Sequence, residues 1–164
     1  MDNKNFDIKL DKNIIDNMIE CAFAARKNAY APYSNYKVGA CILAKKTIED
    51  NPFDTITAGG ESYCLIGGCN IENAAYSPGN CAERTAIFKS VSYGLKEFCA
   101  IVIVAGKDDA VHDYVSPCGV CRQVLREFVN PESFVVIMAK SKDDYKVMSL
   151  EKLLPLSFGP ENLM

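Results

Sequence analysis

Two short segments that are far apart in the chain constrain the fold more than any other feature of this sequence. They are residues 80–84, which read Asn-Cys-Ala-Glu-Arg, and residues 116–122, which read Ser-Pro-Cys-Gly-Val-Cys-Arg. Together they carry three thiols and one carboxylate, a set that can bind a metal ion only if the fold brings both segments together. The sequence therefore predicts a zinc site with a proton-carrying group beside it.

The second segment is predicted to begin a helix over residues 117–129. Pro117 has no N–H and a fixed φ, which suits the first turn of a helix, and apolar residues then recur at helical spacing. Cys118 and Cys121 are three residues apart and share one face of that turn. A helix N-terminus favours the thiolate, the form that binds metal. The pair alone is ambiguous, because this spacing also occurs in redox and structural zinc sites.

The first segment supplies a third thiol. Asn80 is a good N-cap, and the residues from Cys81 to Tyr93 favour a helix that Gly94 ends. Three protein ligands with an open fourth position are typical of a catalytic zinc ion. Glu83 lies two residues after Cys81, so on a helix it points to a different side. It can therefore take a proton from water near the metal without binding the metal itself.

Charge balance predicts a cation next to the cysteines. Three thiolates on Zn²⁺ leave a net charge of minus one, which weakens the ion as a Lewis acid. Arg84 and Arg122 each follow a predicted ligand directly and are the candidates to offset this charge. We favour Arg84 as the donor to the thiolate sulfurs.

Length and composition are those of one soluble globular domain that covers residues 1–164. The net charge of −3 and the lack of a basic stripe argue against a nucleic-acid partner. No segment is apolar enough for a signal peptide or a membrane span, so the eight cysteines indicate a reducing, cytoplasmic setting. Five cysteines remain once the predicted ligands are removed, and we expect them to be buried apolar residues.

The order of the predicted elements indicates an α/β layered fold. Residues 1–9 read as a loose N-terminal tail, and residues 45–61, with Pro52, two glycines and several acidic residues, as a loop. Apolar periodicity predicts these elements, in chain order: a helix over 14–30, strands over 36–44 and 63–70, a helix over 81–93, a strand over 99–105, a helix over 117–129, strands over 134–139 and 145–148, and a helix over 150–154.

Five motifs, in order, resemble the zinc-dependent nucleoside deaminases, and in particular the cytidine deaminase family. They lie in residues 31–40, 68–74, 81–87, 116–128 and 153–160, and the resemblance covers roughly residues 14–164. It implies a three-layer α/β/α fold with a mixed sheet of about five strands, in which residues 45–61 would be an insertion. It also implies one Zn²⁺ per chain and hydrolytic deamination of cytidine and deoxycytidine to uridine and deoxyuridine, with release of ammonia in pyrimidine salvage.

The resemblance also implies roles for residues around the metal. Asn70 and Glu72 would hold a sugar hydroxyl, the Ala82 N–H would bond the base O2, and the Ser116 carbonyl would accept from the amino group that leaves. Glu83 would carry the proton from water to the base and then to the departing amine.

Further substrate contacts are implied at the rim of the site. Tyr36 stands where the family usually has a Phe in the pocket, and its added hydroxyl needs a partner if it is buried. Ala74 and Tyr76 are expected to contact the nucleoside as well. In the homotetrameric three-cysteine deaminases a C-terminal Phe reaches into a neighbouring subunit's active site, and Phe158 matches it.

Two other functions compete with this one. The same scaffold also serves deaminases of modified nucleosides such as blasticidin S, or of a deoxynucleotide. A polynucleotide-editing or nucleic-acid-binding zinc protein is the second alternative, but it would need a basic surface. The single histidine, His112, lies in a charged segment and is expected to be a surface residue and not a ligand. The sequence leaves the preference between ribose and deoxyribose open.

Overall fold

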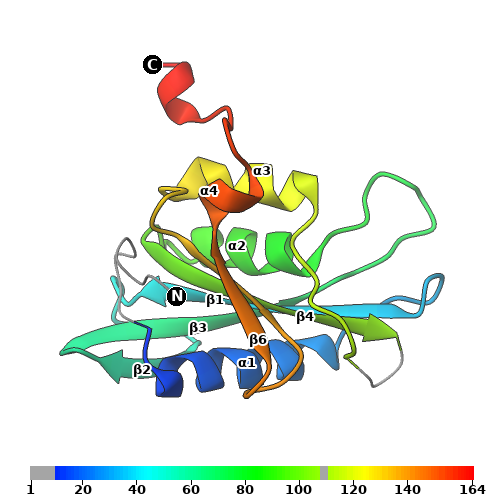
Figure 1. The fold of residues 1–164 in the computed structure, drawn as a ribbon, viewed down its shortest axis with the longest axis horizontal. Coiled ribbons are helices and arrows are strands. Elements are labelled where there is room, and N and C mark those ends of the chain that lie inside the picture. Colours follow the sequence, from blue (N-terminus) through cyan, green and yellow to red (C-terminus); the bar gives the residue numbers. More distant parts are fainter. Residues whose placement is uncertain (1–9, 108–110) are drawn as a thin grey trace.

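The computed structural model describes residues 10–107 and 111–164, in which one mixed sheet lies between two helical layers (Figure 1). Helix α1 covers one face of the sheet, and α2 and α3 cover the other. The three-layer α/β/α fold implied by the sequence is therefore confirmed. The predicted tail over residues 1–9 lies outside the described residues. No helix within the described ranges combines the length and apolar character that crossing a bilayer requires.

The elements follow one another in a simple order. They are α1 (Lys12–Arg26), β1 (Tyr36–Lys45), β2 (Asp54–Ala58), β3 (Glu61–Cys69), α2 (Ala82–Ser92), β4 (Phe98–Lys107), α3 (Gly119–Phe128), β5 (Val135–Ala139), β6 (Tyr145–Ser149), α4 (Leu150–Leu153) and a 3₁₀ turn, η1 (Pro160–Asn162). The strand order across the sheet is β2-β3-β1-β4-β5-β6. Strands β4 and β5 run parallel, and all other neighbours are antiparallel.

The central strands are apolar on both faces because both faces are covered. In β1, Cys41 and Leu43 face α1, whereas the intervening Ile42 faces α2 and α3. Strand β4 is buried throughout except at its ends. This double burial explains the continuous apolar run that predicted a central strand.

The predicted fold class holds, but part of residues 45–61 is a strand and not a loop. The sheet has six strands where about five were expected, because Asp54–Ala58 forms an edge strand instead of a loop. Gly59 and Gly60 join β2 to β3, with φ of 59° and 84°. A two-residue Gly-Gly turn between two extended runs is a hairpin signal, so the sequence did contain the information.

Two glycines let helices lie directly on the sheet. A Cβ at Gly68 in β3 would lie 2.5 Å from the Ala82 carbonyl oxygen and 2.5 Å from the Ala86 nitrogen, both backbone atoms of α2. On the other face, a Cβ at Gly39 would overlap the backbone of α1 at Ala22. The absence of a side chain at Gly68 thus fixes how closely the first turn of α2 approaches the sheet.

Replacing Gly68 by alanine tests this contact. We expect Gly68→Ala to lose about 1–3 kcal/mol of unfolding free energy, because the backbone of α2 has to move away. Gly67→Ala is the matched control, since its Cβ would meet the side chains of Ala25 and Cys21 at 3.2 and 3.3 Å and the nearest backbone atom, the Cys21 carbonyl oxygen, only at 3.7 Å. Urea unfolding measures both variants, and equal stabilities would contradict a role for Gly68 in placing α2.

Candidate metal centre and active site

The fold places the starts of α2 and α3 at the same edge of the sheet. Strands β3 and β4 both run antiparallel to β1, so they run parallel to each other on either side of it. The chain leaves each of these strands at its carboxyl end and then enters a helix on the same face. The two predicted segments, one at each helix N-terminus, therefore meet beside the start of β1.

Each helix begins slightly later than the sequence predicted. Cys81 is the N-cap of α2, where Asn80 was expected, and Cys118 is the N-cap of α3, so Pro117 precedes the helix. Asn80 instead pairs its backbone with Ile71 and donates from its side chain to Thr85 Oγ1 at 3.1 Å. The expectation that all three cysteines lie at helix starts holds, with Cys121 in the first turn of α3.

The three sulfurs are close enough to share one ion. Cys81 Sγ and Cys118 Sγ are 3.9 Å apart, and the sulfurs of Cys81, Cys118 and Cys121 all lie within 4.8 Å of one another. Sulfurs bound tetrahedrally to zinc at about 2.3 Å would be roughly 3.8 Å apart. The donor set and its spacing therefore fit Zn²⁺ with a position left for a further ligand.

Arg84 is the cation next to this cluster. Its Nη2 donates to Cys81 Sγ at 3.5 Å and to the Gly79 carbonyl at 3.4 Å. The pKa of Cys81 is lowered to about 5, first by a hydrogen bond from Cys121 and further by Arg84. Arg84 thus favours the anionic form of a metal-binding thiol.

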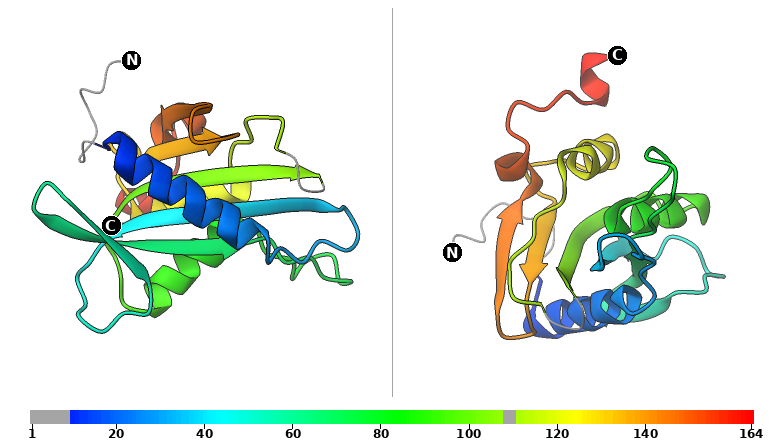
Figure 2. Two further views of the ribbon diagram at one scale, coloured as in Figure 1. Left: turned by 90° about the horizontal axis from the view of Figure 1, so that it is seen from below. Right: turned by 90° about the vertical axis from the view of Figure 1, so that its right-hand side faces the viewer.

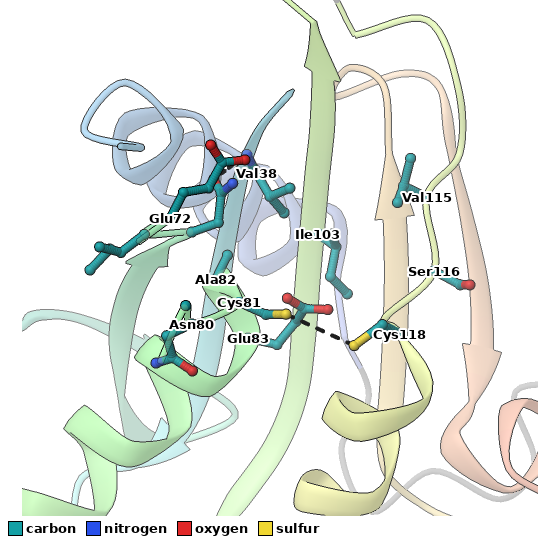
Figure 3. A pocket seen from close by; sticks show the side chains of 13 residues that line it. Val38, Glu72, Asn80, Cys81, Ala82, Glu83, Ile103, Val115, Ser116 and Cys118 are labelled. Atoms are coloured by element: carbon teal, nitrogen blue, oxygen red, sulfur yellow. Dashed lines mark hydrogen bonds between the residues drawn. The ribbon is translucent and has the colours of Figure 1, made fainter. Parts of the chain in front are cut away.

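Glu83 lies beside the thiols and is almost fully buried, with 5% of its surface exposed (Figure 3). Burial raises the pKa of its carboxyl group, and the charge on Cys81 raises it further. A carboxyl group in such surroundings binds a proton more readily than one in water. This is a property that a proton carrier needs.

A pocket of about 310 Å³ opens onto Glu83 and the cysteines (Figure 3). Its lining includes most of the predicted site residues: Asn70, Glu72, Cys81, Ala82, Glu83, Ser116 and Cys118. Val38 and Ile103 add apolar walls from β1 and β4, although the sequence did not single them out. The combination of apolar walls with a few polar groups is typical of a small-molecule site.

Asn70 and Glu72 line the pocket and also hold its backbone. Asn70 Oδ1 accepts from the Val38 N–H at 2.8 Å, and its Nδ2 donates to the Tyr36 carbonyl at 2.9 Å. Glu72 accepts from the Tyr33 N–H at 2.9 Å and from the Ser34 hydroxyl. The side-chain to backbone bonds expected of an ordinary turn are therefore present at residues that also face the pocket.

Four predicted substrate contacts lie outside this lining. Tyr36 is partly exposed at the start of β1, and it is Val38 that faces the pocket. Ala74 and Tyr76 line an adjoining hollow of about 530 Å³ that shares Glu72 with the first. Phe158 is 56% exposed on the C-terminal segment, which extends away from the sheet beyond α3 and α4 (Figures 1 and 2).

Arg122 holds the other side of the pocket through two backbone carbonyls and a hydroxyl group. Its Nε donates to the Pro117 carbonyl and its Nη1 to the Leu153 carbonyl, each at 2.7 Å. Its Nη2 donates to Ser116 Oγ at 2.8 Å. The sequence indicated Arg122 only as a possible charge partner of the thiolates. Its bond to the Leu153 carbonyl could not be predicted, because the two residues are 31 positions apart in the chain.

The remaining cysteines and the histidine behave as predicted in most respects. Cys41, Cys64 and Cys99 are buried, whereas Cys21 and Cys69 are only partly so. None of the eight cysteines, which all lie in the described part of the chain, forms a disulfide bond. His112 is exposed and is not part of the cysteine cluster.

Comparisons with known proteins agree with this geometry. Residues 56–138 match the family model described as the cytidine and deoxycytidylate deaminase zinc-binding region. A cytidine deaminase from Sporosarcina psychrophila is 42% identical over 91% of this chain and 94% of its own length. The crystal structure of a cytidine deaminase from Burkholderia pseudomallei aligns with a TM-score of 0.68 and 39% identity, over 87% of this chain and 97% of that one.

A blasticidin-S deaminase from Bacillus cereus is 37% identical but matches only 48% of this chain and 56% of its own length. The similarity to cytidine deaminases, by contrast, extends across nearly the whole of both chains. With the zinc-binding region, the cysteine cluster and the fold all in agreement, this chain belongs to the zinc-binding cytidine and deoxycytidylate deaminase family.

Proposed function

We propose that this protein is a cytidine deaminase, which hydrolyses cytidine and deoxycytidine to uridine and deoxyuridine and releases ammonia for pyrimidine salvage. The observation that carries the proposal is a buried carboxyl group in a pocket of nucleoside-binding size, next to a cluster of three thiols of which Cys81 and Cys118 line the pocket. We also place the protein in the cytoplasm, where eight cysteines without a disulfide bond suit a reducing environment.

The chemistry is divided between one zinc ion and Glu83. Cys81, Cys118 and Cys121 would hold the ion, which supplies a nucleophile by lowering the pKa of a water molecule. Glu83 takes up the proton that this water loses, delivers it to N3 of the pyrimidine and later protonates the departing amine. Its burial supports this role, because a raised carboxyl pKa lets the group hold a proton between these steps.

The pocket walls orient the nucleoside. Glu72 and Asn70, which both line the pocket, are assigned to the sugar hydroxyl, and the Glu72 side chain lies away from Cys81 and Cys118 (Figure 3). The Ala82 N–H is assigned to the base O2 and the Ser116 carbonyl to the amino group that leaves. Arg122 supports the last of these, since its bonds to Ser116 and Pro117 hold that stretch of backbone in place.

The active site is proposed to be completed by a second copy of the chain. Phe158 is exposed on a projecting segment and does not line the pocket of its own chain. Exposed Tyr33 and Tyr76 lie at the adjoining hollow, which offers an apolar surface to a neighbouring subunit. We assign a homotetramer in which Phe158 stacks on the base in a neighbouring pocket, with Tyr36, Ala74 and Tyr76 near the contact.

Glu83→Gln separates proton transfer from zinc binding. Because glutamine is nearly isosteric but cannot carry a proton, kcat should fall by about 10²–10⁴-fold or more while zinc content stays unchanged. Steady-state kinetics and metal analysis of the same sample provide the measurement. Turnover near that of the unmodified protein would refute the assignment of Glu83.

Arg84→Met tests the charge balance of the metal site. We expect a loss of about 10–100-fold in zinc affinity, because the thiolates lose their cationic donor. Competition with a zinc chelator measures the change. Lys96→Met is the control, as it removes a positive charge at an exposed position after α2. If both variants lost zinc affinity to a similar extent, the loss would result from the change in net charge and not from the contact between Arg84 and Cys81.

Mixed oligomers test whether active sites are shared. Phe158→Ala alone should raise KM about tenfold through lost stacking, without loss of zinc. Co-expression of the Phe158→Ala chain with the Glu83→Gln chain, each carrying its own affinity tag, gives oligomers that contain both. We expect sites with nearly normal KM to reappear, because intact tails meet intact Glu83 pockets. A KM equal to that of Phe158→Ala alone would argue against sharing.

A further inference from the structure

The C-terminal tail, defined here as residues 154–164, leaves most of its large apolar side chains exposed. Leu156 is fully exposed, Phe158 is 56% exposed, and Leu163 and Met164 are 78% and 96% exposed. An apolar segment in this situation has little hydrophobic reason to keep one direction in the isolated chain. The orientation of the tail must therefore be set by polar contacts and by its backbone conformation.

One face of α3 provides those contacts. Arg126 Nε donates to Ser157 Oγ at 3.0 Å, and Arg126 Nη2 forms an ion pair with Glu161. Gln123 Nε2 donates to the Phe158 carbonyl at 2.9 Å. The tail is therefore bonded to α3 just before Phe158, at Phe158 itself and three residues after it.

The centre of this contact is closely packed. Arg126 is only 9% exposed, which is unusual for a charged side chain and indicates that it is held in place. A Cβ at Gly159 would overlap its guanidinium group, so a side chain at this position would displace the guanidinium from the tail. The Gly159 N–H in turn donates to Asn162 Oδ1 at 2.7 Å, which closes the turn that follows.

Two features fix where the tail starts. Arg122 binds the Leu153 carbonyl at the end of α4. Leu156 has a φ of 53°, a left-handed conformation that is uncommon for a non-glycine residue and that turns the chain after α4. The tail thus leaves α4 from an anchored position and turns onto α3 in a defined direction.

We propose that Arg126 is a positioning residue for the active site of a neighbouring subunit, because it clamps the tail of its own chain and so sets the orientation in which Phe158 is presented. This inference rests on the proposed function, in which Phe158 enters the neighbour's pocket. Arg126 itself belongs neither to the cysteine cluster nor to the lining of the pocket at that cluster. Replacing Arg126 should therefore change substrate binding at the active site of the neighbouring subunit, and only when the tail carries Phe158.

The test uses mixed oligomers in which the donor of the tail is varied. The acceptor chain carries Phe158→Ala and keeps Glu83, so it binds cytidine well only when a neighbour supplies the tail. The donor chain carries Glu83→Gln, alone or combined with Arg126→Met, Gly159→Ala or Glu127→Gln. Glu127→Gln is the matched control, because Glu127 is the next residue of α3 and is exposed. The KM for cytidine, zinc content and oligomer mass are measured for each mixture.

We expect the Glu83→Gln donor and its Glu127→Gln derivative to lower KM toward the unmodified value by the same factor. The Arg126→Met donor should leave KM within about twofold of the Phe158→Ala oligomer. Gly159→Ala should do the same, since it displaces the guanidinium without removing it. Zinc content and mass should stay constant, which excludes a folding defect as the cause.

Two other results would each overturn the proposal, and they can be told apart. If the Arg126→Met and Gly159→Ala donors lower KM as well as the control does, the clamp has no role in presenting Phe158, while the shared active site stands. If even the simple Glu83→Gln donor fails to lower KM, the tail does not serve a neighbouring site, and both the shared site and the positioning role of Arg126 fail.

Discussion

The structure depends on bringing two helix N-termini, each with cysteine thiols, to one point at one edge of the sheet. Antiparallel pairing of β1 with both β3 and β4 makes the carboxyl ends of β3 and β4 coincide at that edge. Gly68 then lets α2 lie directly on β3, so that Cys81 and Glu83 sit close to the sheet. The connection from β4 to parallel β5 places α3, with Cys118 and Cys121, on the same face.

The electrostatics of the site follow from this placement. Three thiols within 4.8 Å of one another repel as thiolates, and a divalent cation with Arg84 nearby relieves that repulsion. The same burial that concentrates the charge raises the carboxyl pKa of Glu83. One local environment thus favours the thiolate of Cys81 and a carboxyl group at Glu83 that holds a proton readily, which is the division of roles that hydrolytic deamination requires.

The sequence predicted the chemistry of the site better than its supporting contacts. The three cysteines, Glu83 and Arg84 could be singled out as one candidate cluster because helix starts and ligand spacing are local properties of the chain. The hydrogen bonds of Asn70 to β1, and that of Arg122 to the Leu153 carbonyl, join residues about 30 positions apart in the chain. Such contacts depend on strand register and helix packing, which periodicity does not determine.

The fold shows the same division. Apolar periodicity located every helix and strand of the three layers except β2, which was hidden because glycines and acidic residues also indicate loops. The twin positive φ values at Gly59 and Gly60 show that these residues form the hairpin turn that permits β2. That residues 45–61 are an insertion relative to the family, and that the chain is a single domain, stay predictions.

The most direct test of this account is to mix the purified protein with cytidine and follow the loss of absorbance near the cytidine maximum, with zinc measured on the same sample. The account predicts that absorbance falls as uridine and ammonia form, in a preparation that holds about one zinc ion per chain. A zinc-loaded protein that leaves cytidine and deoxycytidine unchanged, but deaminates a modified nucleoside or a nucleotide, would contradict it.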